Sequence, residues 1–128
     1  MAHGKFTWKT TASGKFHFNL VASNGQVIAS SQTYDSKDSC LAGIESVRKN
    51  ADSHVEDQTV EGFAQLTHPK YEVYVDKAGE FRFRLKARNG ENIVGSEGYK
   101  AKASCINGIE SVKNHAPEAT VVEEEEKK

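Results

Sequence analysis

The sequence has few cysteines and no long apolar run. Two cysteines in 128 residues do not make a disulfide scaffold. No apolar run exceeds about four residues, whereas a membrane span needs roughly 20. The first residues, Met1 to Phe6, lack the apolar core of a secretion signal. These absences argue against a secreted or membrane protein, and we expect a cytoplasmic one.

An excess of charge of one sign is also missing. Lys and Arg number 17 and Asp and Glu number 18, so the formal net charge is -1. Residues 5–65 carry a net charge of -1, residues 66–122 carry +2 and residues 123–128 carry -2. Non-specific nucleic-acid binding usually needs a stronger basic excess. We expect residues 123–128 to form a solvated acidic tail.

The sequence does contain an internal repeat. A shift of 65 residues aligns residues 5–51 with residues 70–116 without a gap, and 20 of these 47 positions are identical. Residues 1–128 are therefore expected to form one pseudo-two-fold domain, with repeat 1 at residues 5–65 and repeat 2 at residues 66–122. A single unit of this size would expose much of its apolar surface, so the two should share a core.

Each repeat begins with a predicted hairpin. Apolar and polar residues alternate, which is the period-two pattern of strands with one buried face. This alternation predicts a register with Trp8 opposite Phe18 in the first repeat, and with Val73 opposite Phe83 in the second. All four side chains then point to the same face of one sheet.

An Asn-Gly pair after the second strand indicates a turn to a third strand. A strict two-residue loop would turn Ile28 to the wrong face, because a slip of one residue exchanges the faces. We therefore expect a loop one residue longer, with Gly25 in the left-handed region and Ile28 opposite Ala22.

A helix is predicted after the third strand. Apolar residues recur at spacings of four, three and four in both repeats, which indicates one buried stripe. Ser36 is a candidate N-cap of the first helix. Its equivalent, Ala101, cannot cap, so we expect the second helix to begin less sharply. The stripe of the first repeat is Cys40, Ile44, Val47 and Ala51.

These residues resemble the tandem repeat of the YegP-like family of uncharacterised bacterial proteins. The likeness rests on the pattern GxFxFxLxAxNGxxI followed by Tyr and GIESV, which occurs twice at the right spacing. The resemblance implies an α+β fold of two tandem β(3)-α-β repeats in a single antiparallel sheet with both helices on one face. It also implies that the last strands, around Val55 and Val121, are exchanged between repeats. It brings no catalytic or binding residues.

The two cysteines occupy equivalent positions in the first helical turn. A helix N-terminus can make a thiol reactive, but each of Cys40 and Cys105 is better explained as a small buried hydrophobe. The histidines lack the spacing of metal sites, and no nucleotide-binding or hydrolase motif occurs. Glu45 and Glu110 are interpreted as structural residues of the helices, either solvated or capping a neighbouring loop. No cofactor, metal or enzymatic activity is therefore expected.

Gly43 and Gly108 occupy equivalent positions within the two predicted helices. Glycine there costs up to about 1 kcal/mol relative to alanine. A close approach of the helix to the sheet is the expected reason.

The predicted strand at residues 82–88 carries a run of alternating basic side chains. They should project from the face opposite the helices, with Glu72 pairing Arg84 and Tyr74 stacking on Arg82. The candidate binding surface is Tyr74, Arg82, Arg84, Lys86 and Arg88.

Three functional hypotheses follow. The favoured one is a small, monomeric, non-enzymatic binding module that uses the open face of the sheet, with a possible protein partner. The first alternative is single-stranded nucleic-acid binding through the basic strand from Arg82 to Arg88. The second alternative is a thiol-based enzyme. Almost all positions that are kept in both repeats are assigned to core and turns, so we expect any local function to be weighted toward repeat 2.

Overall fold

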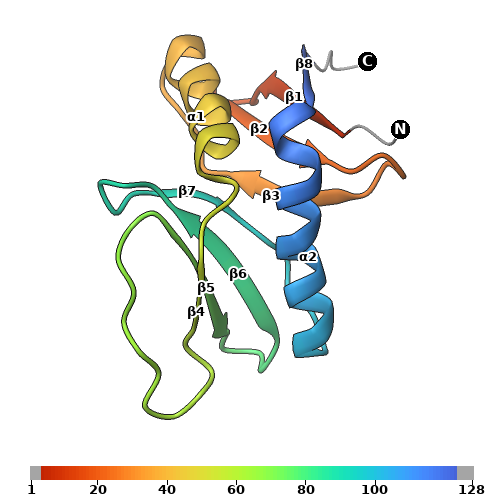
Figure 1. Cartoon of the computed structure of the whole chain (residues 1–128). Helices are drawn as coiled ribbons and strands as arrows, with labels where there is room; N and C mark the ends of the chain where they lie inside the picture. Colours follow the sequence, from red (N-terminus) through yellow and green to blue (C-terminus); the bar gives the residue numbers. More distant parts are fainter. Residues whose placement is uncertain (1–3, 124–128) are drawn as a thin grey trace.

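The computed structural model describes residues 4–123 and is an α+β fold (Figure 1). The two long helices are α1 (Lys37–Asn50) and α2 (Lys102–His115), and a short 3-10 helix, η1 (Ala116–Glu118), follows α2. The strands of this part of the chain are β1 (Lys5–Thr10), β2 (Phe16–Val21), β3 (Val27–Ser31), β4 (Val55–Asp57), β5 (Lys70–Val75), β6 (Phe81–Lys86), β7 (Asn92–Gly95) and β8 (Thr120–Glu123).

The eight strands form one mixed sheet in the order β4-β5-β6-β7-β3-β2-β1-β8. The expectation of a fully antiparallel sheet is wrong, because β4 runs parallel to β5 and β8 runs parallel to β1. The alternation of apolar residues could not reveal this, since period two is common to both strand directions. β4, the last strand of repeat 1, pairs with β5 of repeat 2, and β8, the last strand of repeat 2, pairs with β1 of repeat 1. The two repeats therefore exchange their last strands, as expected.

The pairing of β8 with β1 is shifted by one residue relative to the equivalent pairing of β4 with β5. Val55 lies opposite Tyr71, whereas Val121 lies opposite Phe6. Tyr71 and Phe6 are equivalent positions of the two repeats, which are 65 residues apart. Their partners Val55 and Val121 are 66 residues apart, so one extra residue precedes Val121. The extra residue falls in the segment that contains η1, between α2 and β8.

The predicted hairpin registers are confirmed, with Trp8 opposite Phe18 and Val73 opposite Phe83. The predicted pairing of Ile28 with Ala22 is wrong. Val27 lies opposite Val21, and the register then shifts by one residue, which places Ile28 at a β-bulge. The loop is one residue longer than a two-residue turn, as expected, because Ala22 pairs with Gln26. The bulge that follows then turns Ile28 into the core.

Gly25 has the expected positive φ, at 88°. The hydrogen bond from the Ala22 N–H to the Gln26 carbonyl closes the loop. The second hairpin repeats both the glycine conformation and the register shift.

Both helices lie on one face of the sheet, where they cover a single core (Figure 1). The predicted stripe is confirmed, since Cys40, Ile44 and Val47 are fully buried, as are their equivalents in α2. The Ser36 side chain accepts a hydrogen bond from the Ser39 N–H, whereas Ala101 provides no side-chain cap. The helices nevertheless begin at equivalent residues, so the missing cap does not displace the start of α2.

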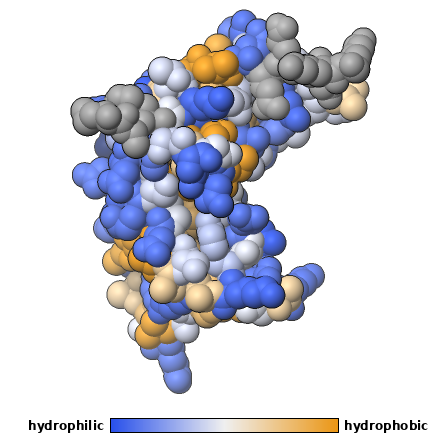
Figure 2. Space-filling model, turned by 90° about the vertical axis from the view of Figure 1, so that its right-hand side faces the viewer, coloured by the Kyte–Doolittle hydropathy of each residue, from blue (hydrophilic) through white to orange (hydrophobic). Residues whose placement is uncertain are grey.

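The opposite face of the sheet is open. In side view the molecule has a hollow between its upper and lower parts, on the side turned away from the helices (Figure 2). None of the helices between residues 4 and 123 combines the length and apolar character needed to cross a membrane.

Candidate binding surfaces

The predicted basic surface divides in the structure. Arg82, Arg84 and Lys86 lie in β6 and alternate with the buried Phe83 and Leu85. Their side chains therefore project from the open face, where they are half-buried. Arg88 follows the end of β6 and lines a groove beside α1 instead. Sequence reasoning grouped it with the others because it continues their alternation.

On the open face, the arginines already have acidic partners. Arg84 Nε lies 2.6 Å from Glu72 Oε1, which confirms the predicted cross-strand pair. The predicted stacking of Tyr74 on Arg82 is wrong, because the guanidinium over the Tyr74 ring is that of Arg84, at 4.3 Å from the centroid. Arg82 is drawn away by Asp76, since Arg82 Nε lies 2.6 Å from Asp76 Oδ2.

A buried charge cluster, which sequence reasoning missed, adjoins this surface. Lys70 Nζ lies 2.6 Å from Glu56 Oε1 and 3.1 Å from Glu72 Oε2. Glu56 also accepts hydrogen bonds from Gln58 Nε2 and from the Leu66 N–H. The cluster thereby attaches the segment between β4 and β5 to the sheet.

The carboxylates of the open face remain ionised at neutral pH. Burial alone would raise the pKa of Glu72, but hydrogen bonds from Arg84 and Lys70 and their charges lower it below its usual value. The hydrogen bond from Arg82 lowers the pKa of Asp76. The charges of Arg82 and Arg84 are therefore balanced by carboxylates of the protein itself. Lys86 is the cation of β6 that has no carboxylate partner among residues 4–123.

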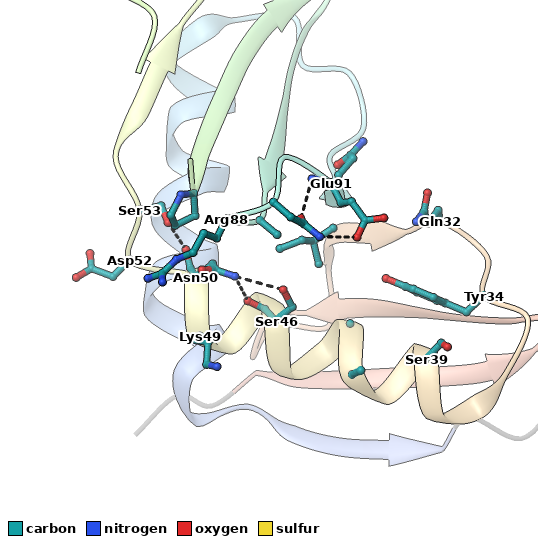
Figure 3. Close-up of a pocket in the computed structure, with 17 residues that line it drawn as sticks. Gln32, Tyr34, Ser39, Ser46, Lys49, Asn50, Asp52, Ser53, Arg88 and Glu91 are labelled. Atoms are coloured by element: carbon teal, nitrogen blue, oxygen red, sulfur yellow. Dashed lines mark hydrogen bonds between the residues drawn. The ribbon is translucent and has the colours of Figure 1, made fainter. Parts of the chain in front are cut away.

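A groove of about 1000 Å³ lies between α1 and the β6–β7 turn, which we call the α1 groove (Figure 3). It joins the two repeats, because the helix belongs to the first and the turn to the second. Its polar lining residues include Tyr34, Ser39, Ser46, Asn50, Arg88 and Glu91.

A second groove of about 820 Å³ lies between α2 and the β2–β3 turn, which we call the α2 groove. Most of its lining positions match those of the α1 groove at a shift of 65 residues. Seven lining positions carry the same residue type in both grooves, among them Tyr34 and Tyr99, and Ser39 and Ser104. Almost all positions kept in both repeats were expected to serve core and turns, and these two serines are exceptions, since both are exposed.

Each groove has a tyrosine packed beneath its helix. The Tyr99 hydroxyl lies 2.8 Å from the position that a Cβ on Gly108 would occupy, and Tyr34 approaches Gly43 in the same way. The predicted close approach at these glycines is thus confirmed, and it involves a tyrosine as well as the sheet. Burial raises the pKa of both hydroxyls, so they remain protonated at neutral pH and can donate hydrogen bonds.

The cysteines are free and fully buried. Burial, with a smaller effect of the Asp57 charge, raises the pKa of Cys105 to about 11. Burial also raises the pKa of Cys40. Both groups are therefore thiols at neutral pH, which disfavours nucleophilic chemistry. Within residues 4–123 no group of three His, Cys, Asp or Glu side chains could hold a metal ion.

Comparisons with known proteins agree on one family. The model of the domain of unknown function DUF1508 matches the chain twice, at residues 12–57 and 76–123. The UPF0339 protein in the ptx operon 5′ region of Stutzerimonas stutzeri is 42% identical over 120 residues, which cover 94% of this chain and 96% of that protein.

Other relatives clarify the repeat and the fold. A UPF0339 protein of Agrobacterium fabrum is 60% identical over 55 residues, which are 43% of this chain but 89% of that protein, so it is about one repeat long. The solution NMR structure of the protein of unknown function yegP from E. coli matches with a TM-score of 0.79 and 32% identity. That match covers 100% of this chain and 98% of the yegP chain.

Proposed function

Because this chain belongs to the DUF1508 family of uncharacterised proteins, as the resemblance of its repeats indicated, we propose its function from its own surfaces. It is a non-enzymatic interaction module that binds a protein partner through the open face of the sheet. The observation that carries this proposal is the arrangement of Tyr74, Arg84 and Glu72, in which the arginine is fixed between a ring and a carboxylate.

Such an arrangement suits a protein interface. Tyrosine and arginine are the residue types that most often dominate binding energy at protein interfaces. Here their side chains are ordered before a partner arrives, so less conformational entropy is lost on binding. Lys86, on the same strand, adds a positive charge that can select an acidic partner surface.

The same contacts count against the nucleic-acid alternative. Binding to phosphates depends on cations that are free to replace counterions. Arg82 and Arg84 each have a carboxylate partner at 2.6 Å, and a phosphate would have to displace it. A protein partner can instead use the paired groups as they stand.

We further propose that the module is monomeric and cytoplasmic. The exchanged strands β4 and β8 give each repeat the neighbour that a second chain would otherwise supply. The raised pKa values of the two buried thiols support the assignment to a non-enzymatic protein.

Site-specific photo-crosslinking in cells tests this proposal. A benzoylphenylalanine at position 74 should capture a defined protein, whereas the same group at position 9, the equivalent position of repeat 1, should not. Lys86→Glu should abolish capture at position 74, and Lys9→Glu should leave it unchanged. Equal capture at both positions, or capture that Lys86→Glu does not affect, would reject this surface.

A titration with mixed single-stranded oligonucleotides distinguishes the proposed protein binding from the nucleic-acid alternative. Under the proposal, amide NMR shifts at residues 82–86 are absent or vanish as salt rises to near-physiological concentration. Shifts that persist and saturate at that salt concentration would replace the protein partner with a nucleic acid.

A further inference from the structure

We propose that the α1 and α2 grooves each bind a segment of extended peptide, and that the α1 groove prefers a segment with a carboxylate at the end beside Arg88. These grooves lie between helix and turn, apart from the open face of the sheet. The inference therefore stands independently of the function proposed above.

The first argument is the length of the grooves. Ser39 and Asn50 both line the α1 groove and are 11 positions apart in the helix, or about 16 Å at 1.5 Å per residue. Ser104 and His115 mark the same length in the α2 groove. An extended chain rises about 3.3 Å per residue, so about five residues span each groove.

The second argument is the chemistry that the grooves share. The α1 groove is lined by three hydroxyl side chains, those of Tyr34, Ser39 and Ser46, and also by Gly43 and Ile93. Hydroxyls both donate and accept hydrogen bonds, which matches the N–H and C=O groups of a peptide backbone. The equivalent hydroxyls recur in the α2 groove, whereas no charged residue is kept in both. The part of a ligand that both grooves can recognise is therefore neutral and polar, as a peptide backbone is.

The third argument comes from the centre of the sheet. β3 and β7 pair only at Ser30 with Gly95 and at Ser31 with Val94. Beyond these pairs β7 continues to Asn92 and β3 to Val27 without pairing with each other. Ile93 of β7 lines the α1 groove, and Ile28 of β3 lines the α2 groove. Each groove thus offers the continuing edge of a strand, against which an extended peptide can align.

The preference of the α1 groove comes from Arg88. The other three arginines of the sequence each have an acidic partner within 4 Å, but Arg88 has no ion pair or hydrogen bond with any residue from 4 to 123. It lies toward the Asn50 end of the groove, and Tyr34 lies toward the other (Figure 3). The equivalent residue in the α2 groove is Ser23.

Two acidic residues also line the α1 groove. Glu91 accepts a hydrogen bond from Asn89 Nδ2 at 2.9 Å, and Asp52 lies just beyond the end of α1. Their charges oppose a ligand with several negative charges, such as a nucleotide. A peptide with one carboxylate fits this mixed environment better.

The test uses a soluble hexapeptide probe. An acetylated peptide of alternating threonine and valine, with a free carboxylate end, is titrated into the full chain and followed by amide NMR shifts. Saturable shifts are expected for residues of both grooves. The same peptide with an amidated end should bind the α2 groove equally well and the α1 groove about tenfold more weakly, because one charge-assisted contact is lost.

Matched variants locate the sites. Ala42 and Asn107 are equivalent, exposed positions that line the α1 and α2 grooves. Ala42→Trp should abolish shifts in the α1 groove alone, and Asn107→Trp those in the α2 groove alone. Arg88→Gln should remove the preference for the carboxylate end. Lys86→Glu, on the open face, should change none of these results.

Several outcomes would overturn the inference. No saturation at millimolar peptide, shifts outside the grooves, or shifts that survive both tryptophan variants would each reject a peptide site. A mononucleotide that saturates the α1 groove more tightly than the peptide would reassign the ligand class. Unchanged spectra away from the substituted helix face establish that the variants fold.

Discussion

Lys70 Nζ lies 2.6 Å from Glu56 Oε1, and the two side chains are only 2% and 1% exposed. This contact joins β5 of repeat 2 to β4, which repeat 1 supplies. The identical residue of repeat 1, Lys5, is exposed. The same residue type at equivalent positions therefore has a structural role in one repeat and is solvated in the other.

Replacement of Lys70 by methionine should strongly destabilise the fold. It leaves Glu56 and Glu72 buried without their shared cation, and loss of one partner of a buried ion pair costs about 3 kcal/mol or more. Lys5→Met provides the matched control and should change the free energy of unfolding by less than about 0.5 kcal/mol. Urea unfolding measures both. Equal losses would show that the buried contact does not stabilise the fold.

Acid should destabilise the protein partly through Glu56. Burial alone would raise its pKa, but hydrogen bonds from Gln58, Lys70 and Leu66 lower it from 4.5 to about 2. A lowered pKa stabilises the fold above the ordinary value, and this stabilisation is lost as pH falls from about 4.5 to about 2. Thermal unfolding between pH 7 and pH 2 should therefore show a smaller drop in Tm for Glu56→Gln than for the wild type. Parallel curves would contradict the assignment.

Gly108→Ala should destabilise the protein although alanine favours helices. Its Cβ would lie 2.8 Å from the Tyr99 hydroxyl and 2.9 Å from Phe83 Cε2, so the side chains would have to move. Overpacking of this kind costs about 1–3 kcal/mol. Tyr99→Phe in the same chain should restore part of the loss, which a double-mutant cycle measures. The absence of coupling would mean that the hydroxyl does not limit the space.

The cysteines should react slowly in the native protein. Both side chains are buried, and the pKa of Cys105 is raised to about 11. Labelling with an aromatic disulfide at pH 7.5 should follow the rate of protein opening, and both thiols should react at once in denaturant. Labelling of either thiol within seconds under native conditions would revive the thiol-enzyme alternative.

The sequence predicted the elements of this fold well because its signals are local. Alternation of Trp8 and Phe18 with polar neighbours predicted the hairpin register, since successive side chains of a strand point to opposite faces. The spacing of Cys40, Ile44 and Val47 predicted α1 for the equivalent reason in a helix. The bulge at Ile28 was missed because one extra residue leaves no mark on composition.

The sequence predicted the candidate sites less well. It identified the pair of Glu72 and Arg84, because the register places them opposite each other. It assigned the Tyr74 ring to Arg82 rather than Arg84, since long side chains also reach diagonal neighbours on a sheet.

By itself, the sequence determined the repeat, which a shift of 65 residues reveals. It also determined the type of each element and the buried face of each strand and helix, which follow from periodicity over a few residues. Only the tertiary structure decided the parallel direction of β4 and β8, the burial of Lys70 beside Glu56, and the grooves in which a helix of one repeat faces a turn of the other. These features depend on contacts between residues far apart in the chain, and local periodicity carries no information about which distant segments meet.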